Sequence, residues 1–417
     1  MAQVNRLKDV KEWVHYCGRC NSCKYLYRDY RPSCPAFEKF FYDSYTCSGK
    51  IWIADDLLKG KYPISESAMK KIFSCTLCGN CAKQCQQEAG KHALDIFEAL
   101  REECVEAGVG PLEAHKLFRS NIQKFGNPYG ELPEQRWEGI PEKYFKENAE
   151  VLFFVGCTSA LRNKQLMHDT LDLLEALGVN FTLAKDEVCC GSPLFTTGQQ
   201  KFARELAEKN LQTFQRLGLK TIITACSGCY RSIGSQYAKK FGLFPTKEEL
   251  ETIKDKKKRK EAMPFEILHI TEYLAKIIKS KYFDNSQKIY VTYHDPCHLG
   301  RHMSVFEDPR KIIKAIPNVQ LIEFPRNKDN AWCCGAGAGI KSAMKDWAVE
   351  IAEERIKEMK ELEATQKKSI NILLSACPFC ERNLSDAVES LKSKNQAEYQ
   401  NIKVMDVVQF LKSVLKK

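Results

Sequence analysis

The spacing of the cysteines constrains this chain more than any other feature. Eighteen of the twenty cysteines fall into two kinds of pattern. Residues 1–91 contain two Cys-x-x-Cys-x-x-Cys runs, each followed by one further cysteine. From Val151 onward, a lone cysteine, a Cys-Cys-Gly triplet and a Cys-x-x-Cys pair follow one another, and this order occurs twice. The second part of the chain is therefore predicted to be a duplicated unit.

Chain length and the redox state of the cell compartment help to decide whether such cysteines form disulfides or bind metal. At 417 residues the chain is long enough for two or three domains. It has no uninterrupted apolar run of about 18 residues, and its first residues, MAQVNRLKDVKEWVHY, lack the apolar core of a secretory signal. We therefore expect a cytoplasmic protein that associates with a membrane only through a partner subunit. In a reducing compartment, clustered cysteines favour metal ligation over disulfides.

The net charge is +11, and much of the excess lies in Lys254–Lys260, inside a polar insertion that runs from Pro245 to Pro264. A run of this kind is typical of a solvated loop or helix face. No basic stripe interleaved with aromatic residues accompanies it, so nucleic-acid binding is disfavoured. Attraction to an anionic substrate, an acidic partner or a membrane surface stays open.

Each N-terminal run is suited to an iron–sulfur cubane, because a short irregular loop can turn three closely spaced thiolates inward. In two-cluster ferredoxins the fourth cysteine of each run ligates the other cluster. The two predicted [4Fe–4S] sites are Cys17, Cys20 and Cys23 with Cys85, and Cys75, Cys78 and Cys81 with Cys34. Structural zinc is the competing interpretation, but zinc ribbons use separate pairs rather than triplets.

The first run departs from the bacterial ferredoxin pattern. Ten residues separate Cys23 from Cys34, where that pattern is far shorter, so the loop between them must bulge. Helical stretches are predicted over 51–58, 66–73 and 92–106. A helical two-cluster ferredoxin domain is therefore expected rather than the small β-hairpin kind.

The duplicated part alternates apolar runs with amphipathic stretches. Each lone cysteine and each Cys-x-x-Cys pair ends an apolar run (VLFFVGC, IYVTYHDPC, LKTIITAC, INILLSAC), and a weaker run precedes each triplet (VNFTLA, VQLIEF). Helical stretches over 163–177, 201–217 and 343–360 lie between them. This alternation predicts βαβ units with parallel strands, whose loops carry the cysteines at the carboxyl ends of the strands. The two copies supply Cys157, Cys189, Cys190, Cys226 and Cys229, and Cys297, Cys333, Cys334, Cys377 and Cys380.

The strings VGC…VCCGSP…ACSGCYR and YHDPCHLGR…WCCGAGAG…ACPFC resemble the paired cysteine-rich CCG domains of heterodisulfide reductase. The order of two cubane motifs and then two CCG domains is similar to that of the reductase's D subunit over nearly the whole chain. The iron–sulfur subunits of glycolate oxidase and anaerobic glycerol-3-phosphate dehydrogenase share this layout. The resemblance divides the chain into a helical ferredoxin-like domain (1–110), a linker (111–150), a first CCG domain (151–244), a basic insertion with a connecting helix (245–288) and a second CCG domain (289–417).

The resemblance also implies cofactors and an activity. Each CCG motif would hold a noncubane [4Fe–4S] cluster through its five cysteines, with the second set catalytic. A redox partner (a membrane cytochrome b, a flavoprotein or a flavin-containing reductase subunit) would supply electrons for reducing a small anionic disulfide of the CoM-S-S-CoB type. The glycine after each adjacent pair would allow the sharp turn that two neighbouring ligands need. A zinc ion on part of each motif, or an empty domain, is the alternative for these sites.

The second hypothesis is an electron-transfer subunit with no disulfide substrate. It would carry electrons between a flavoprotein dehydrogenase, for glycolate, lactate, glycerol-3-phosphate or an acyl-CoA, and a membrane quinone carrier. Complete CCG motifs favour the reductase, because a relay needs no iron that can bind a thiolate.

A few residues near the motifs have separate interpretations. His294 and His298 flank Cys297, and one of them is hypothesised to give a proton to a departing thiolate, a role that suits a near-neutral pKa. A hydrogen-bonded structural role is the alternative. Cys47 and Cys104 lie outside any ligand spacing and are predicted to be ordinary buried or half-buried thiols.

Overall fold

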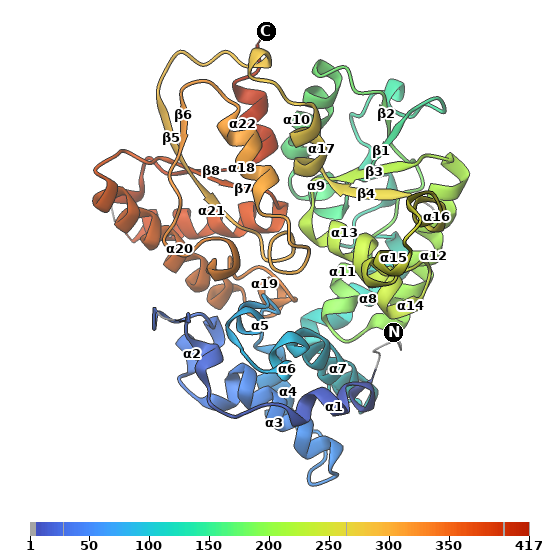
Figure 1. Cartoon of the computed structure of the whole chain (residues 1–417), viewed down its shortest axis with the longest axis vertical. Coiled ribbons are helices and arrows are strands. Elements are labelled where there is room, and N and C mark those ends of the chain that lie inside the picture. Colours follow the sequence, from blue (N-terminus) through green and yellow to red (C-terminus); the bar gives the residue numbers. More distant parts are fainter. Residues whose placement is uncertain (1–5, 28, 264, 395–396, 417) are drawn as a thin grey trace.

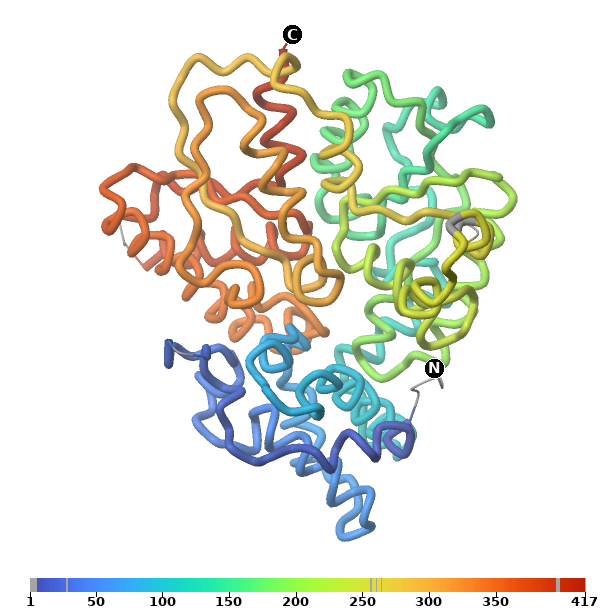
Figure 2. The backbone as a smooth tube through the Cα atoms, viewed as in Figure 1, coloured from blue at the N-terminus to red at the C-terminus, as the bar shows by residue number. Residues whose placement is uncertain are grey.

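The computed structural model describes residues 6–27, 29–263, 265–394 and 397–416, and it divides into three parts (Figure 1). The N-terminal helices, in blue, lie beneath two α/β halves, in green and in orange to red. Figure 2 shows the two halves as separate lobes whose lower ends both face the N-terminal part. Among the described residues, no helix combines the length and the apolar character that a membrane span requires.

The N-terminal part is helical, as expected from its spacer segments. Thr46 and Ser65 cap α3 and α4, since the side chain of each accepts a hydrogen bond from a backbone N–H of the first turn. Ile51, Phe73 and Phe97 belong to the apolar core that these helices share. The helices are α1 (Lys11–His15), α2 (Pro35–Phe40), α3 (Cys47–Leu58), α4 (Glu66–Phe73), α5 (Asn80–Gln84), α6 (Glu88–Lys91) and α7 (Ala93–Glu106).

Each half contains a four-stranded parallel sheet, which confirms the predicted α/β architecture. The strand orders are β2-β1-β3-β4 and β6-β5-β7-β8, so the two sheets have the same topology. Val151 of β1 pairs with Phe181 and Thr221, and Val291 of β5 pairs with Leu321 and Ile372. The strands are β1 (Val151–Phe153), β2 (Phe181–Thr182), β3 (Thr221–Thr224), β4 (Glu266–His269), β5 (Ile289–His294), β6 (Val319–Leu321), β7 (Ile372–Ser375) and β8 (Lys403–Asp406).

Helices cover the faces of both sheets, as buried parallel strands require. The first half contains α8 (Glu113–Phe125), α9 (Cys157–Leu161), α10 (Lys164–Ala176), α11 (Ser192–Thr196), α12 (Gln200–Leu217), α13 (Ser227–Arg231), α14 (Tyr237–Phe241), α15 (Lys247–Thr252), α16 (Lys256–Ala262) and α17 (Ile270–Ile277). The second contains α18 (Glu307–Lys314), α19 (Ile340–Ala343), α20 (Lys345–Gln366), α21 (Pro378–Ser393) and α22 (Val407–Ser413).

The two halves meet through matching helices. Helices α10 and α18 occupy corresponding places near the first strand of each half, and α17 and α22 each follow the last strand. Helix α10 packs against α22, and α17 packs against α18, so each contact is the counterpart of the other. A single apolar core includes Leu171, Leu274, Ile312 and Leu411 from these four helices. The two copies of the duplicated unit therefore pack as a pseudo-symmetric pair.

Two strands were not predicted. Strand β4 lies in the segment 245–288, which the sequence assigns to a basic insertion and a connecting helix, and it pairs with β3. Strand β8 lies near the C-terminus, in the segment 289–417 that the sequence assigns to the second CCG domain, and it pairs with β7. Both are short edge strands whose first residue is exposed, so neither contains the apolar run that identifies the other strands. Most of the basic run lies in the short helix α16, with α15 just before it, and the Lys257 side chain is 86% exposed.

Candidate metal centres

The eighteen predicted ligand cysteines gather where the N-terminal helices meet the carboxyl ends of both sheets. Each of the twenty cysteines is a free thiol. The four groups are Cys17, Cys20, Cys23 and Cys85 (N1); Cys34, Cys75, Cys78 and Cys81 (N2); Cys157, Cys189, Cys190, Cys226 and Cys229 (C1); and Cys297, Cys333, Cys334, Cys377 and Cys380 (C2).

Group N1 combines the first run with Cys85, the last cysteine of the second run. Burial raises the pKa of Cys85, and the charges of Cys17, Cys20 and Cys23 raise it further. The sulfur of Cys85 therefore lies near the three sulfurs of the first run. Gly90 allows this approach, because a Cβ atom there would lie 2.1 Å from the Cβ of Cys85. Cys20 is exposed, and its Sγ lies 3.0 Å from the Oγ of Ser22. One edge of N1 therefore faces solvent.

Group N2 combines the second run with Cys34. All four of its cysteines line one small cavity between α2, α3 and α5. Burial raises the pKa of Cys34 to about 12. The backbone N–H of Leu77 donates to the Sγ of Cys75 over 3.4 Å. In N1 and N2 alike, the fourth cysteine comes from the other run, which is the grouping that cross-ligation requires.

Groups C1 and C2 have the same internal order of thiol contacts. In C1 the lone cysteine contacts the first of the adjacent pair, and the second of the pair contacts the last of the Cys-x-x-Cys pair. C2 repeats both contacts. Gly191 and Gly335 have φ of +82° and +81°, and each donates its N–H to the sulfur two residues before it, at 3.4 and 3.3 Å. The turn expected after each adjacent pair is thus present in both copies.

The four groups form one continuous line. Cys47 contacts both Cys23 of N1 and Cys81 of N2 through its side chain. Cys78 of N2 contacts Cys333 of C2 in the same way. The C1 and C2 loops then meet where the Oγ of Ser227 donates to the carbonyl of Ala376 over 2.7 Å, which brings Cys226 and Cys377 into side-chain contact. The order is therefore N1, N2, C2 and C1.

Arg101 of α7 ties the N-terminal part to both halves at this junction. Its guanidinium is fully buried, and burial lowers its pKa to about 10. It donates to the carbonyls of Thr196, Ala338 and Cys75, which lie in the first half, the second half and the N2 loop. One side chain thus joins all three parts beside N2.

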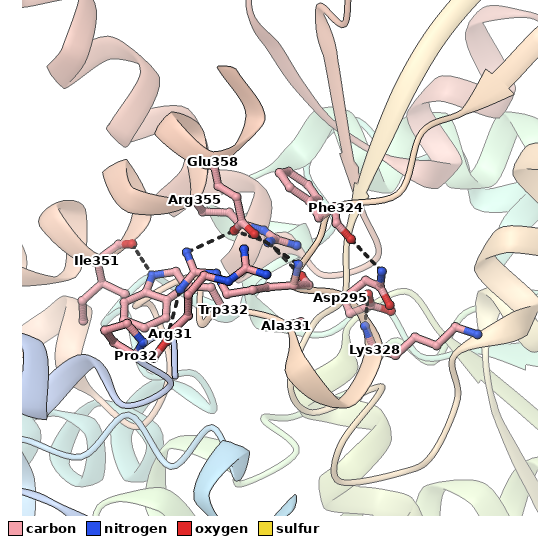
Figure 3. A network of polar contacts seen from close by, with 12 residues as sticks. Arg31, Pro32, Asp295, Phe324, Lys328, Ala331, Trp332, Ile351, Arg355 and Glu358 are labelled. Carbon is pink, nitrogen blue, oxygen red and sulfur yellow. Dashed lines mark hydrogen bonds and ion pairs between the residues drawn. The ribbon is translucent and has the colours of Figure 1, made fainter. Parts of the chain in front are cut away.

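The loop that leads to Cys333 and Cys334 is fixed by a polar network (Figure 3). The indole N–H of Trp332 donates to the carbonyl of Ile351 at 2.8 Å. The backbone N–H of Lys328 donates to Asp295 at 2.8 Å, and Arg355 donates to Glu358 at 2.6 Å while its guanidinium lies 3.4 Å from the ring centre of Phe324. This network gives the second motif a rigid support.

A buried pair of charged side chains, Arg136 and Glu187, supports the first motif. The guanidinium of Arg136 donates to the Sγ of Cys157 at 3.2 Å and to the carboxylate of Glu187 at 2.5 Å. Glu187 also accepts from the N–H groups of Val155 and Gly156, and burial raises its pKa to about 7. Arg136 lies in the segment 111–150, which the sequence assigns to a linker. Residues of this segment therefore reach the first site.

A cavity of about 220 Å³ opens between the two halves and reaches C2. Four cysteines of C2 line it, namely Cys297, Cys334, Cys377 and Cys380. From the first half it is lined by residues such as Ser192 and Gly228, and by none of the C1 cysteines within the described chain. Lys341 and Arg382 supply positive charge, and Phe118, Tyr129 and Phe379 supply aromatic walls.

The two candidate histidines occupy different places. His298 lines the cavity, and its Nδ1 lies 3.3 Å from the Sγ of Cys297. His294 lies deeper, where one ring nitrogen is within 4.8 Å of the sulfurs of Cys334 and Cys380. Burial lowers the pKa of His298 to about 4. Proton donation by either histidine stays a prediction.

Cys47 is buried, as predicted, but its spacing did not indicate where it lies. It is buried at the start of α3 and contacts both N-terminal groups, although no spacing rule connects it to either. Only the docking of α3 between the two runs reveals this position. Cys104, the other cysteine outside the patterns, is fully buried in the core of the N-terminal part, as expected.

Three comparisons relate the chain to known proteins. The family model of the cysteine-rich domain, CCG, matches residues 151–234 and 291–385. The chain is 36% identical over 369 residues to the D subunit of the dihydromethanophenazine:CoB–CoM heterodisulfide reductase of Methanosarcina barkeri, covering 86% of this chain and 82% of that one. It is 28% identical over 357 residues to the EtfAB:quinone oxidoreductase of Syntrophomonas wolfei, covering 82% of this chain and 46% of that one.

Among solved structures, a hypothetical protein from Helicobacter pylori is similar in fold, with a TM-score of 0.54 and 11% sequence identity over 89% of this chain and 68% of that one. At this identity the likeness concerns the fold alone. The sequence relatives go further, because the 36% identity to the Methanosarcina barkeri protein extends over most of both chains and accompanies the two cysteine-rich repeats. The chain belongs to the family of heterodisulfide reductase D subunits, which are iron–sulfur oxidoreductases.

Proposed function

We propose that the chain is the catalytic subunit of a heterodisulfide reductase-type complex. Groups N1 and N2 would each hold a cubane [4Fe–4S] cluster, and C1 and C2 would each hold a noncubane one. The thiols fit such groups, since each set converges from loops and short helices and no disulfide engages any of the twenty cysteines. When bound, the clusters supply one-electron transfer at these four positions.

The cavity beside C2 is the observation that carries the proposal. A subunit that only relays electrons needs no opening at any of its redox sites, yet four C2 cysteines line a space of about 220 Å³. Small-molecule sites have this character, with apolar and aromatic walls and a few polar groups that set orientation. The asymmetry between C1 and C2 indicates that substrate meets the second repeat.

The lining favours an anionic disulfide. Reduction follows R–S–S–R′ + 2 e⁻ + 2 H⁺ → R–SH + R′–SH, so the S–S bond breaks and each sulfur gains one electron and one proton. Lys341 and Arg382 would bind acidic ends such as a sulfonate and a phosphate, and Phe379 would cover the apolar part and exclude water. These features suit a substrate of the CoM-S-S-CoB type.

The line of cysteine groups suits electrons that arrive from a partner. Cys20 is exposed at N1, the first group of the line, and the cavity lies beside C2, the third group. Between these points Cys47 contacts both N1 and N2, and Cys78 of N2 contacts Cys333 of C2. We infer that a redox partner binds near N1, on the side of the molecule away from the substrate cavity.

His298 is the better placed of the two histidines for a role in the reaction, because it lines the cavity and contacts Cys297. We propose that it donates or accepts a hydrogen bond at that sulfur, and proton donation stays a prediction. Replacing His298 with Gln should lower turnover and leave the iron content unchanged. Unchanged turnover would remove it from the mechanism, and His294→Gln provides the matched comparison.

In the test, purified, cluster-loaded protein is mixed with reduced viologen as the electron donor. The mixed disulfide and a quinone analogue are then supplied as acceptors in parallel assays. Oxidation of viologen that depends on the disulfide supports the reductase. Oxidation that depends on the quinone, with none on the disulfide, supports the electron-transfer alternative, which the similarity to an EtfAB:quinone oxidoreductase favours.

A further inference from the structure

Lys50 is a buried cation at the centre of the N-terminal part. It lies in α3, and only 1% of the residue is exposed. Its ammonium donates to the carbonyl of Tyr45 and lies 6.0 Å from the ring centre of Phe97. Within the described residues, Lys50 forms no ion pair with a carboxylate. A buried charge without such a partner is costly, so its presence calls for a compensating negative group nearby.

The thiols of the two N-terminal sites lie around α3 near Lys50, and they carry negative charge when they ligate a metal. Lys50 lines the same cavity as the cysteines of N2, including Cys34 and Cys75. One turn earlier in α3, Cys47 contacts Cys23 of N1 and Cys81 of N2. The next residue of α3, Ser48, reaches N1, since its Oγ lies 4.0 Å from the Sγ of Cys17. The first turns of α3 therefore lie between the two sites.

A cation in this position acts on electron transfer through electrostatics. A cubane held by four thiolates carries net negative charge, and each added electron increases it. A positive charge a few ångströms away in a low-dielectric interior stabilises the reduced form more than the oxidised form. The N-terminus of α3 adds partial positive charge of the same sign.

We propose that Lys50 sets the reduction potentials of both N-terminal sites, raising them together so that each accepts an electron more readily. This inference rests on the proposed function only in taking N1 and N2 as cubane sites. Lys50 is not a catalytic residue, because it touches neither substrate nor the C2 cysteines, and it acts only through its charge. Its effect should therefore appear in redox equilibria rather than in disulfide binding.

The test compares Lys50→Met with Lys50→Arg, which keeps the charge, and with Lys59→Met, which removes an exposed lysine at the other end of α3. Iron and acid-labile sulfide are measured first, and the N-terminal clusters are then titrated with potential under electron paramagnetic resonance. In Lys50→Met the reduced-to-oxidised ratio at a fixed potential should fall at least tenfold at both sites, about 59 mV for a one-electron couple. In the other two variants it should change less than threefold.

Full iron content with an unchanged ratio in Lys50→Met would overturn the inference. A change at one site only would also contradict it, because the proposal places Lys50 between both. If Lys50→Met does not assemble its clusters, Lys50→Gln replaces it, since the amide can still donate to Tyr45 without the charge, and the same tenfold change is required. If the wild-type protein binds no N-terminal cluster, the cluster assignment itself is refuted. The iron measurement shows this directly, so it is distinguished from a failure of the Lys50 inference.

Discussion

Replacing Gly156 with alanine should weaken cluster binding at C1 alone. Gly156 has φ +77° and ψ 151°, a conformation essentially restricted to glycine. An added Cβ atom would lie 2.8 Å from the Sγ of Cys229, roughly 1 Å inside an ordinary non-bonded separation. The backbone cost is of order 1–3 kcal/mol, and relieving the contact requires Cys229 to move.

A total cost of roughly 2–4 kcal/mol corresponds to about a 30- to 1,000-fold weaker site. The assay is iron release to a chelator, followed over time. One quarter of the iron, about four of sixteen atoms, should leave Gly156→Ala at least tenfold faster than it leaves the wild type, because a [4Fe–4S] cluster holds four irons. The other three quarters should leave at the wild-type rate.

Gly178→Ala is the matched control. Gly178 also has a positive φ, of +70°, but nothing lies within 4 Å of the position of an added Cβ. It therefore carries a backbone cost without the contact with a cysteine. If Gly156→Ala releases iron with the same profile as Gly178→Ala, the assignment of Cys229 to a cluster at C1 is refuted.

Three further predictions concern other parts of the molecule. Gly90→Ala places a Cβ atom 2.1 Å from that of Cys85, so it should remove the electron paramagnetic resonance signal of one reduced cubane. Two unaltered signals would refute the cross-ligated N1 site. Arg382→Met should raise the KM for an anionic disulfide about tenfold, or 1.4 kcal/mol, with little change in kcat, whereas equal losses for an uncharged disulfide would contradict its binding role. Burial raises the pKa of Glu102 to about 8, so the stability it contributes is complete at low pH and is lost as pH rises toward 8. The free energy of unfolding of Glu102→Gln, measured with urea, should therefore rise relative to that of the wild type as the pH increases from 5 to about 9. A difference between the two proteins that stays constant over this range would refute the prediction.

Much of the fold follows from sequence patterns because those patterns record burial. The apolar runs before the cysteines became β1, β3, β5 and β7, and the helix predicted over 66–73 has the bounds of α4. Strands β4 and β8 could not be recognised, because edge strands of four residues with an exposed start have no continuous apolar run.

The cysteine groups were predictable from spacing, but their order in space was not. Spacing is local, whereas the contacts of Cys78 with Cys333 and of Cys226 with Cys377 depend on how whole domains dock. The same reason explains why the places of Lys50 and Cys47 beside the two N-terminal sites could not be predicted. Their positions matter only once α3 lies between two runs that are about 50 residues apart in sequence.

A single-turnover experiment tests the central claim that this chain reduces a disulfide by itself. Cluster-loaded protein is reduced, the excess reductant is removed, and one equivalent of the mixed disulfide is added without oxygen. We predict that two thiols form for each disulfide consumed and that the protein loses two electrons. Protein that stays fully reduced and releases no thiol would contradict the account.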